Sequence, residues 1–355
     1  MIVKSEDLFV FLHKLAAGEP GDFYSVWVPV KSSESGDGEY FYASLAETDE
    51  NTDVTIDGYR TVDPIKMLYY RFREKVLPTE YPSVKQVVMG VKACDLQALA
   101  LMDRALMNES FVDPAYRHWR ESITVVSADC TDLAASCHCI LSNGVPYPET
   151  GYDVNLSAID DSYVVTTGSE KGRDFVSLLK KEIPWEEASP EHLDRVNQRR
   201  QDMVTGLHEA NEPYFRPDSF TALRSADLDR WEDESTSCVG CGACTNICPS
   251  CYCLILNDES TADQFTKIRT YDSCQLFGYA RVAGGATPRP QMTQRFRHRY
   301  LCKFTLMPGD FDMLGCTGCG RCVDACPGNI DIRSVLKNIM DRSAKELEAT
   351  PVETM

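Results

Sequence analysis

Buried strands and amphipathic helices alternate in the apolar pattern of the first half of the chain. The run from Val84 to Val91 is largely apolar and predicts a short buried strand. Asp95 to Met107 places apolar residues at helical spacing, and Ile123 to Ser127 predicts a second strand. This order of strand, helix and strand indicates a βαβ unit and a parallel sheet. A further strand and helix, Ser162 to Thr167 and Arg173 to Lys181, suggest that another unit follows.

Helical spacing continues in a polar segment, His192 to Glu209, that leads towards a cysteine-rich region. Prolines and many charges interrupt the periodicity from about Asn211 to Asp233, which predicts a linker. A last helix is expected from Ile332 to Leu347, where apolar residues recur at helical spacing. We therefore expect an α/β domain with a parallel or mixed sheet over residues 1–210, a linker over 211–233 and a second domain over 234–348.

Two runs of cysteines in the second half share one spacing. In each run, two residues separate the first three cysteines, three residues precede the fourth, and a proline follows it. The runs are Cys238, Cys241, Cys244, Cys248 and Pro249, and Cys316, Cys319, Cys322, Cys326 and Pro327. This spacing is typical of proteins with two iron–sulfur clusters, where the fourth cysteine of each run usually binds the other run's cluster. The expected pairing is therefore crossed.

Each expected cluster is a [4Fe-4S] cubane bound by four thiolates. The first would be bound by Cys238, Cys241, Cys244 and Cys326. The second would be bound by Cys316, Cys319, Cys322 and Cys248. Two four-cysteine zinc sites are the alternative, although zinc sites rarely use two overlapping triplets followed by proline. Residues 249–315 are too long a gap for the compact bacterial ferredoxin repeat, so we expect an α-helical ferredoxin domain with two clusters over residues 234–348.

Four further cysteines fall in the α/β half: Cys94, Cys130, Cys137 and Cys139. Cys94 follows the first predicted strand and Cys130 follows the second, so parallel strands would bring both to one edge of the sheet. Thiolates are favoured near the N-terminus of the helix that begins beside Cys94. The four cysteines therefore suggest a third iron–sulfur cluster, [4Fe-4S] rather than [2Fe-2S]. Two alternatives stay open: reduced thiols packed in the core, and a zinc site with His138 as a substitute ligand.

The last four cysteines form a looser set: Cys251, Cys253, Cys274 and Cys302. Their spacing fits no single motif. Either they bind a further metal, or they surround the clusters as thiols that tune the cluster potentials without binding iron.

Composition limits the class of protein. The 355 residues predict roughly two or three domains, and 43% apolar content is enough for real cores. A formal charge of −18 argues against nucleic-acid binding, which needs a positive surface. Glu6 and Asp7 stand where the apolar core of a signal peptide would begin, and no apolar run reaches the roughly 18 residues of a membrane span. We therefore expect a cytoplasmic protein without direct membrane insertion.

Basic residues cluster in one stretch of this acidic chain: Arg289, Arg295, Arg297, Arg299 and Lys303. Most such runs are solvated faces. The alternative is that these cations offset cluster charge or dock an acidic redox partner.

Several short motifs combine with the cysteine runs. They are Lys92-Ala93-Cys94-Asp95-Leu96, Cys130 with Cys137-His138-Cys139, Cys248-Pro249-Ser250-Cys251-Tyr252-Cys253, Asp272-Ser273-Cys274, the basic segment Arg295–Tyr300, and Gly318-Cys319-Gly320-Arg321-Cys322. Together they resemble the family that contains the iron–sulfur subunit of anaerobic sulfite reductase and the beta subunit of sulfhydrogenases, which are cytosolic hydrogenases. The resemblance runs from about Val84 to Glu348 and favours the third cluster on Cys94, Cys130, Cys137 and Cys139.

The resemblance implies an electron-transfer subunit of a cytoplasmic, anaerobic, multisubunit oxidoreductase rather than a catalytic subunit by itself. Its implied neighbours are a flavoprotein subunit that binds FAD and NAD(P)H, and a catalytic reductase or hydrogenase subunit that acts on sulfite, protons, sulfur or a disulfide. The sequence holds no Gly-x-Gly-x-x-Gly turn between strand and helix, so we expect no bound nucleotide or flavin in this chain. Two other classes stay open: a redox or iron-sensing interaction protein, and a self-sufficient polysulfide reductase.

Overall fold

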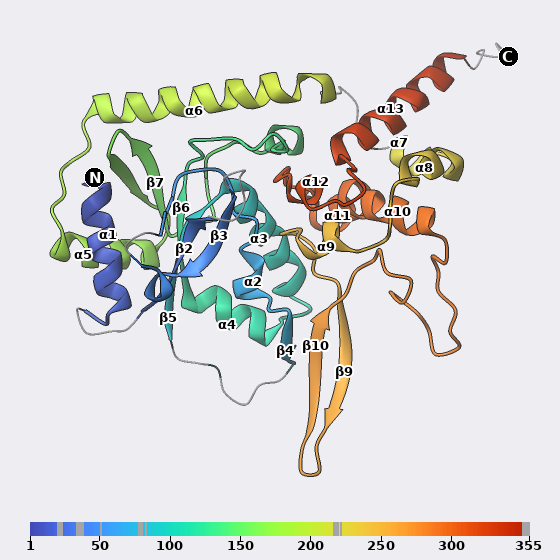
Figure 1. The fold of residues 1–355 in the computed structure, drawn as a ribbon, viewed down its shortest axis with the longest axis horizontal. Helices are drawn as coiled ribbons and strands as arrows, with labels where there is room; N and C mark the ends of the chain where they lie inside the picture. Colours follow the sequence, from blue (N-terminus) through green and yellow to red (C-terminus); the bar gives the residue numbers. More distant parts are fainter. Residues whose placement is uncertain are drawn as a thin grey trace.

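The computed structural model describes residues 1–19, 24–32, 39–49, 52–76, 81, 84–215, 220 and 222–349. The first half of the chain is built on one seven-stranded sheet (Figure 1). In spatial order the strands are β1 (Ile2–Lys4), β8 (Ser162–Thr167), β7 (Val154–Ile159), β6 (Ile123–Ala128), β5 (Lys85–Val91), β2 (Tyr24–Lys31) and β3 (Tyr40–Ser44).

The sheet is mixed, as the predicted α/β domain allowed. The central strands β7, β6, β5 and β2 are parallel, and the outer strands β8, β1 and β3 each pair antiparallel with their inner neighbour. β5 and β6 confirm the two strands predicted from apolar runs, and α3 (Ala93–Leu106) confirms the helix between them.

The expected second βαβ unit is wrong. The strand and the helix exist, as β8 and as α5 (Glu170–Glu182), but β8 pairs antiparallel with β7. A tight turn with Asp160 at φ 48° joins β7 to β8, and such a turn can connect only antiparallel neighbours.

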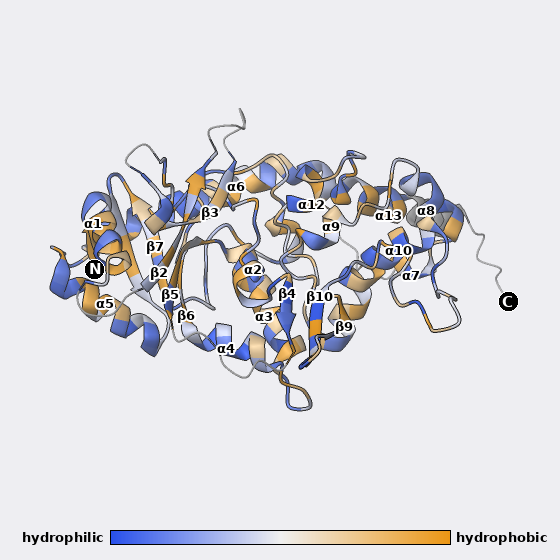
Figure 2. Ribbon diagram, turned by 60° about the horizontal axis from the view of Figure 1, so that its bottom comes forward, coloured by the Kyte–Doolittle hydropathy of each residue, from blue (hydrophilic) through white to orange (hydrophobic). Residues whose placement is uncertain are grey.

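Helices cover both faces of the sheet because its central strands are apolar on both sides. α1 (Ser5–Ala16) and α5 pack on one face, in the same core as Val87 and Met89 of β5. α3, α4 (Pro114–Ser122) and the residues around α2 (Lys66–Tyr69) pack on the other, with Val88 and Val91. Figure 2 shows the hydrophobic colour of β5 and β6 between these layers.

The polar helix predicted over His192–Glu209 is confirmed as α6 (Pro190–Asn211), which runs along the top of the molecule in Figure 1. Ser189 caps its N-terminus by accepting a hydrogen bond from the His192 N–H, and Pro190 fits the first helical position. Arg200 in its middle donates to Asp129 at 2.8 Å, which fixes the helix over the carboxyl end of β6.

The C-terminal half is mostly helical. It contains α7 (Ala222–Ser225), α8 (Leu228–Ser235), α9 (Ala243–Asn246), α10 (Met292–Leu301), a π-helical turn (Cys302–Leu306), α11 (Met307–Phe311), α12 (Arg321–Asp324) and α13 (Ile332–Ala349). α13 confirms the predicted last helix. Trp231, Phe296, Tyr300 and Ile339 form the centre of the core between these helices. No helix in the described part of the chain combines the length and the apolar character needed to cross a bilayer.

The predicted linker over 211–233 is wrong in its second half, which is helical. α7 and most of α8 lie inside this segment, and their Leu223 and Trp231 are fully buried. Pro217, one of the residues that suggested the linker, lies outside the described residues. Because large apolar side chains gain free energy on burial, the segment from Ala222 onwards joins the helical core.

A hairpin that the sequence analysis did not predict projects from the helical half (Figure 1). Its strands are β9 (Leu254–Ser260) and β10 (Phe265–Tyr271), and β10 also pairs with β4 (Arg73–Lys75) of the first half. Arg269 of β10 is buried and forms ion pairs with Glu74 and Asp113. The two halves are therefore joined by a shared sheet and by buried charges.

Candidate metal centres

Three cysteines of the first run meet the last cysteine of the second run. Cys238, Cys241, Cys244 and Cys326, here called the first group, line one cavity. Cys238 lies close enough to the other three for their charges to raise its pKa in addition to the effect of burial. Cys241 is exposed and the others are half-buried. The fold thus brings together the four thiols expected for the first cluster, at one edge of the helical half.

The second group, Cys316, Cys319, Cys322 and Cys248, is deeper. Cys248 lies close to Cys319 and Cys322, and Cys322 lies close to Cys316. Burial raises the pKa of the Cys322 thiol to about 12, so metal binding would have to displace its proton. Cys322 also lines the cavity of the first group. The two groups therefore adjoin.

The backbone around both groups suits a thiolate-bound cluster. Gly240 and Gly242 have φ of 65° and 78°, and Gly318 and Gly320 repeat this geometry with 65° and 77°. Left-handed residues of this kind turn successive N–H groups towards one point, which makes a concave site for anions.

Two buried polar atoms beside the thiols have no hydrogen-bond partner within the described ranges: Arg299 Nε and Thr317 Oγ1. Arg299 lines the cavity of the first group, and Thr317 lies directly after Cys316. Leaving a buried donor unpaired is costly, and cluster sulfur is an acceptor that could satisfy it. The residues present therefore fit iron–sulfur clusters.

The third group, Cys94, Cys130, Cys137 and Cys139, gathers at one edge of the sheet. Cys94 lies in the first turn of α3 after β5, and Cys130 follows β6. Cys130 is close to Cys94 and Cys137, and Cys139 is close to Cys130 and Cys137. Burial raises the pKa of the Cys130 thiol to about 12. The parallel strands bring Cys94 and Cys130 to one edge, as predicted, and the loop that follows Cys130 adds Cys137 and Cys139.

The third group packs directly against the second. The backbone N–H of His138 donates to the Gly318 carbonyl oxygen at 2.8 Å. Its ring Nδ1 lies 2.8 Å from the Ser136 carbonyl oxygen, so that nitrogen carries the proton, and Nε2 faces Cys316 Sγ at 3.8 Å. Burial lowers the pKa of His138 to about 4. His138 is therefore neutral near pH 7 and faces the second group, which leaves the four thiols as the ligands available to the third.

Comparison with known proteins identifies the segment that contains both runs. Residues 237–330 match the sequence family described as "4Fe-4S dicluster domain". Residues 237–330 are called the dicluster domain below, after this match. The chain is also 29% identical over 325 residues to a protein of Pyrococcus furiosus named sulfhydrogenase 2 subunit beta, across 89% of this chain and 92% of that protein. The resemblance inferred from the motifs is confirmed as a distant homology.

We expect Gly318→Ala to force the dicluster domain away from the third group. A Cβ at this position would lie 2.4 Å from the Cys139 Cα and 2.4 Å from the His138 carbonyl oxygen, and a left-handed backbone alone costs about 1–3 kcal/mol. Anaerobic thermal unfolding and iron content measure the effect. Gly284→Ala is the matched control because a Cβ there would meet nothing within 4 Å. Equal melting temperatures for the two variants would contradict the close packing.

Two buried arginines hold the dicluster domain against the first half. Arg321 donates to both carboxylate oxygens of Asp95, at 2.9 and 2.8 Å, and each residue is only 1% exposed. Arg60 donates to the Cys319 carbonyl oxygen at 2.7 Å and pairs with Asp324. Arg321 belongs to a motif that the sequence analysis noted. Arg60 was missed, because nothing in its sequence neighbourhood marks it as a contact of the second group.

The basic stretch is not a solvated face. Arg295, Arg299 and Lys303 are buried, and only Arg289 and Arg297 are partly exposed. Arg299 lies near Cys244 and Cys322, whose charges raise its pKa although burial acts in the opposite direction. The buried part of the stretch therefore fits the alternative in which cations offset cluster charge, because a buried side chain cannot dock a partner.

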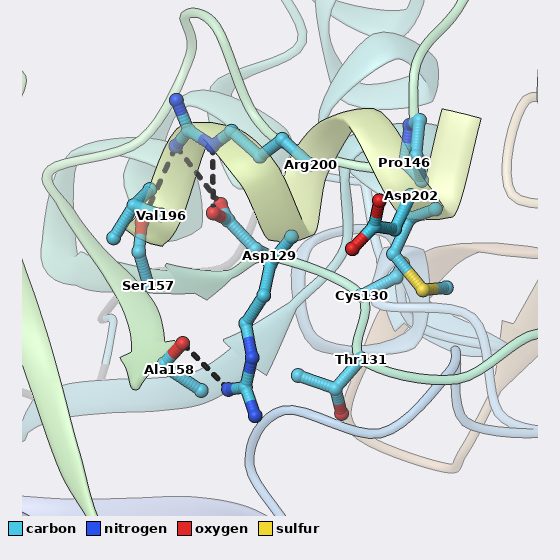
Figure 3. A pocket seen from close by; sticks show the side chains of 11 residues that line it. Asp129, Cys130, Thr131, Pro146, Ser157, Ala158, Val196, Arg200 and Asp202 are labelled. Carbon is cyan, nitrogen blue, oxygen red and sulfur yellow. Dashed lines mark hydrogen bonds and ion pairs between the residues drawn. The ribbon is translucent and has the colours of Figure 1, made fainter. Parts of the chain in front are cut away.

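A pocket lies between the edge of the sheet and α6 (Figure 3). Asp129 and Cys130 line it from the sheet side, and Val196 and Arg200 line it from α6. Farther along the helix, Asn211 donates to the Cys137 carbonyl oxygen at 3.0 Å. α6 therefore covers part of the third group, and Cys130 of that group lines the pocket.

The looser set, here called the fourth group, also lies beside the second group. Cys251 interacts with Cys248, and Cys253 interacts with Cys274. Cys302 lies close to Cys253 and Cys248. Among the residues that the structure describes, no three His, Cys, Asp or Glu side chains converge closely enough to hold a single metal ion.

Proposed function

We propose that this chain is an electron-transfer subunit that relays single electrons through iron–sulfur clusters held by its first, second and third groups. Bound [4Fe-4S] clusters would supply one-electron oxidation and reduction at potentials set by their surroundings. The chain itself contributes the positions of the thiols, their burial and the charges beside them.

The contiguity of the three groups is the observation that carries the proposal. Cys322 belongs to the second group and lines the cavity of the first. Cys319 belongs to the second group and lies close to Cys94 and Cys137 of the third. Metal sites that only stabilise the fold do not have to lie next to one another. Clusters that pass electrons to one another do. The second group is the middle member of the series.

The two ends of the series differ in exposure. Cys241 of the first group is exposed, and its neighbour Val239 is 66% exposed. Cys137 and Cys139 of the third group are each only 9% exposed and lie partly under α6. The first group is therefore the end that a redox partner can approach most closely, whereas Cys137 and Cys139 of the third group are shielded.

We infer that the chain works within a larger complex, since its relative in Pyrococcus furiosus is named as a subunit of a sulfhydrogenase. By this likeness its neighbours are a flavoprotein subunit that binds FAD and NAD(P)H and a catalytic reductase or hydrogenase subunit, in the cytoplasm. The catalytic neighbour determines whether sulfite, protons, sulfur or a disulfide is reduced. Electrons can pass through the chain in either direction.

Anaerobic purification followed by iron and sulfide counting tests this proposal. We expect at least about twelve irons per chain if the three groups hold cubanes, and about eight if only the dicluster domain does. Cys137→Ser is expected to remove about four irons, because it deletes one ligand of the third group. Thr131→Ser, which keeps the hydroxyl of a residue in the same loop, is the matched control. Unchanged iron content in Cys137→Ser would reject the third cluster.

A further inference from the structure

The fourth group collects thiols from three separate segments of the chain. Cys251 and Cys253 follow the end of the first run, Cys274 follows β10, and Cys302 begins the π-helical turn between α10 and α11. Cys253 interacts with Cys274, and Cys302 lies close to both. Cys251 lies beside Lys66, which is also close to Cys253. Nothing in the proposed relay uses these four residues.

Hydrogen-bond donors face this group of thiols. Gln275 Nε2 donates to Cys274 Sγ at 3.5 Å, and the Tyr279 hydroxyl lies 3.6 Å from Cys253 Sγ. Donors of this kind stabilise sulfur that carries negative charge, as metal-bound thiolates do.

Two buried lysines beside the group supply a stronger argument. Lys66 and Lys303 are 1% and 2% exposed, and neither pairs with a carboxylate of the described residues. Lys66 Nζ donates to the Cys251 carbonyl oxygen at 2.9 Å, and Lys303 Nζ donates to Ser250 Oγ and the Gly315 carbonyl oxygen, both at 3.0 Å. Buried charges are normally paired or placed beside a metal site.

The anions near both lysines are the sulfur atoms. Lys66 lies close to Cys251, Cys248 and Cys253. Lys303 lies close to Cys248, Cys251 and Cys316. One cluster at the second group accounts for part of this positive charge. A second centre with a divalent core and four thiolates would add a net charge of about −2 next to the same two ammonium groups.

The helix that carries Cys302 is irregular at that residue. The π-helical turn Cys302–Leu306 interrupts what would otherwise be one continuous helix from α10 to α11. Single π turns inside helices are uncommon and occur frequently at functional sites. Cys302 in this turn lies beside Cys253, and Lys303 in the same turn is buried. The irregular turn therefore lies next to the thiols and the buried lysines.

We propose that Cys251, Cys253, Cys274 and Cys302 hold a fourth iron–sulfur cluster next to the second group. Four soft thiolates select zinc or iron–sulfur chemistry among biological metals. We choose iron–sulfur over zinc because no three of these side chains are placed to bind a single ion, which is equally true of the cysteine runs of the dicluster domain. Binding would release the thiol protons to solvent. This inference goes beyond the proposed relay and does not depend on it.

Metal analysis of the full chain, purified without oxygen, tests the fourth cluster. We expect about sixteen irons per unmodified chain, instead of the roughly twelve that three clusters would hold. Cys253→Ser and Cys302→Ser should each contain about four irons fewer than the unmodified chain. The use of two ligand variants on separate segments guards against a folding defect in either one. Thr305→Ser is the matched control, because Thr305 lies in the same π-helical turn as Cys302, is not a ligand and keeps its hydroxyl as serine, so its iron content should equal that of the unmodified chain.

The outcomes separate this site from the relay. Cys137→Ser combined with Cys253→Ser should lose about eight irons if the third and fourth groups hold independent cubanes. Loss of one zinc and no iron from Cys253→Ser and Cys302→Ser would overturn the iron–sulfur assignment. Unchanged iron, sulfide and zinc in both variants would overturn the site itself, while the loss caused by Cys137→Ser would still stand.

Discussion

Replacing Arg321 with methionine is expected to lower the free energy of unfolding by about 3–5 kcal/mol. The guanidinium forms a two-point ion pair with Asp95 at the contact between the dicluster domain and α3, and both partners are 1% exposed. Arg321 Nε also donates to the Thr61 carbonyl oxygen at 2.8 Å. Without the arginine, a carboxylate stays buried with no cation beside it, which costs more than the lost attraction itself.

A second variant separates this cause from a simple packing defect. Arg321→Met combined with Asp95→Leu removes both charges, and replacing a buried ion pair with apolar residues of similar volume is often close to neutral. The double variant should therefore recover most of the lost stability. Anaerobic urea unfolding followed by circular dichroism measures both. If the double variant is as unstable as the single one, the unpaired Asp95 carboxylate is not the reason for the loss.

The position of Cys326 beside the first cysteine run could be predicted because ligand spacing follows from cluster chemistry. Cys326 reaches the cavity of Cys238 although 87 intervening residues lie between them in the sequence. The third group could be predicted for a different reason: parallel strands bring their carboxyl ends, and hence Cys94 and Cys130, to one edge. Both inferences use rules that hold whatever the rest of the chain does.

The contacts between the groups could not be predicted in this way. Gly318 lies against the backbone of His138 and Cys139, and only the three-dimensional packing of two distant segments decides that contact. The same limit applies to Lys66, which lies in the first half and donates to the Cys251 carbonyl oxygen of the second half. Local sequence carries no signal for either contact.

Two errors have simple physical causes. The apolar pattern predicts a parallel neighbour where β8 pairs antiparallel with β7, because apolar content alone does not distinguish the two pairings. The basic stretch suggested a solvated face because arginine and lysine are rarely buried. Arg299 and Lys303 are buried beside thiols instead. Buried basic residues therefore accompany the candidate metal centres in this chain.

Replacing Cys319 with serine is expected to interrupt the series of thiol groups at its middle. The variant should lose about four irons, and the cluster at the third group should then be reduced much more slowly than the cluster at the first. Cys319 is the residue of the second group that lies close to both Cys94 and Cys137, so its loss should disturb the side of the second group that faces the third. Rapid mixing with a reduced ferredoxin, followed by freezing and electron paramagnetic resonance, measures both rates.

Cys137→Ser is the matched control for this experiment because it should also lose about four irons, but from the buried end of the series. The first group has an exposed ligand, Cys241, and should accept electrons at the same rate in both variants. In Cys137→Ser the second group should still be reduced promptly through the first, because Cys322 lines the cavity that the first group shares with it. A third group that is reduced as fast in Cys319→Ser as in the unmodified chain would mean that electrons reach it by a route outside the dicluster domain, and the linear order of the relay would be wrong.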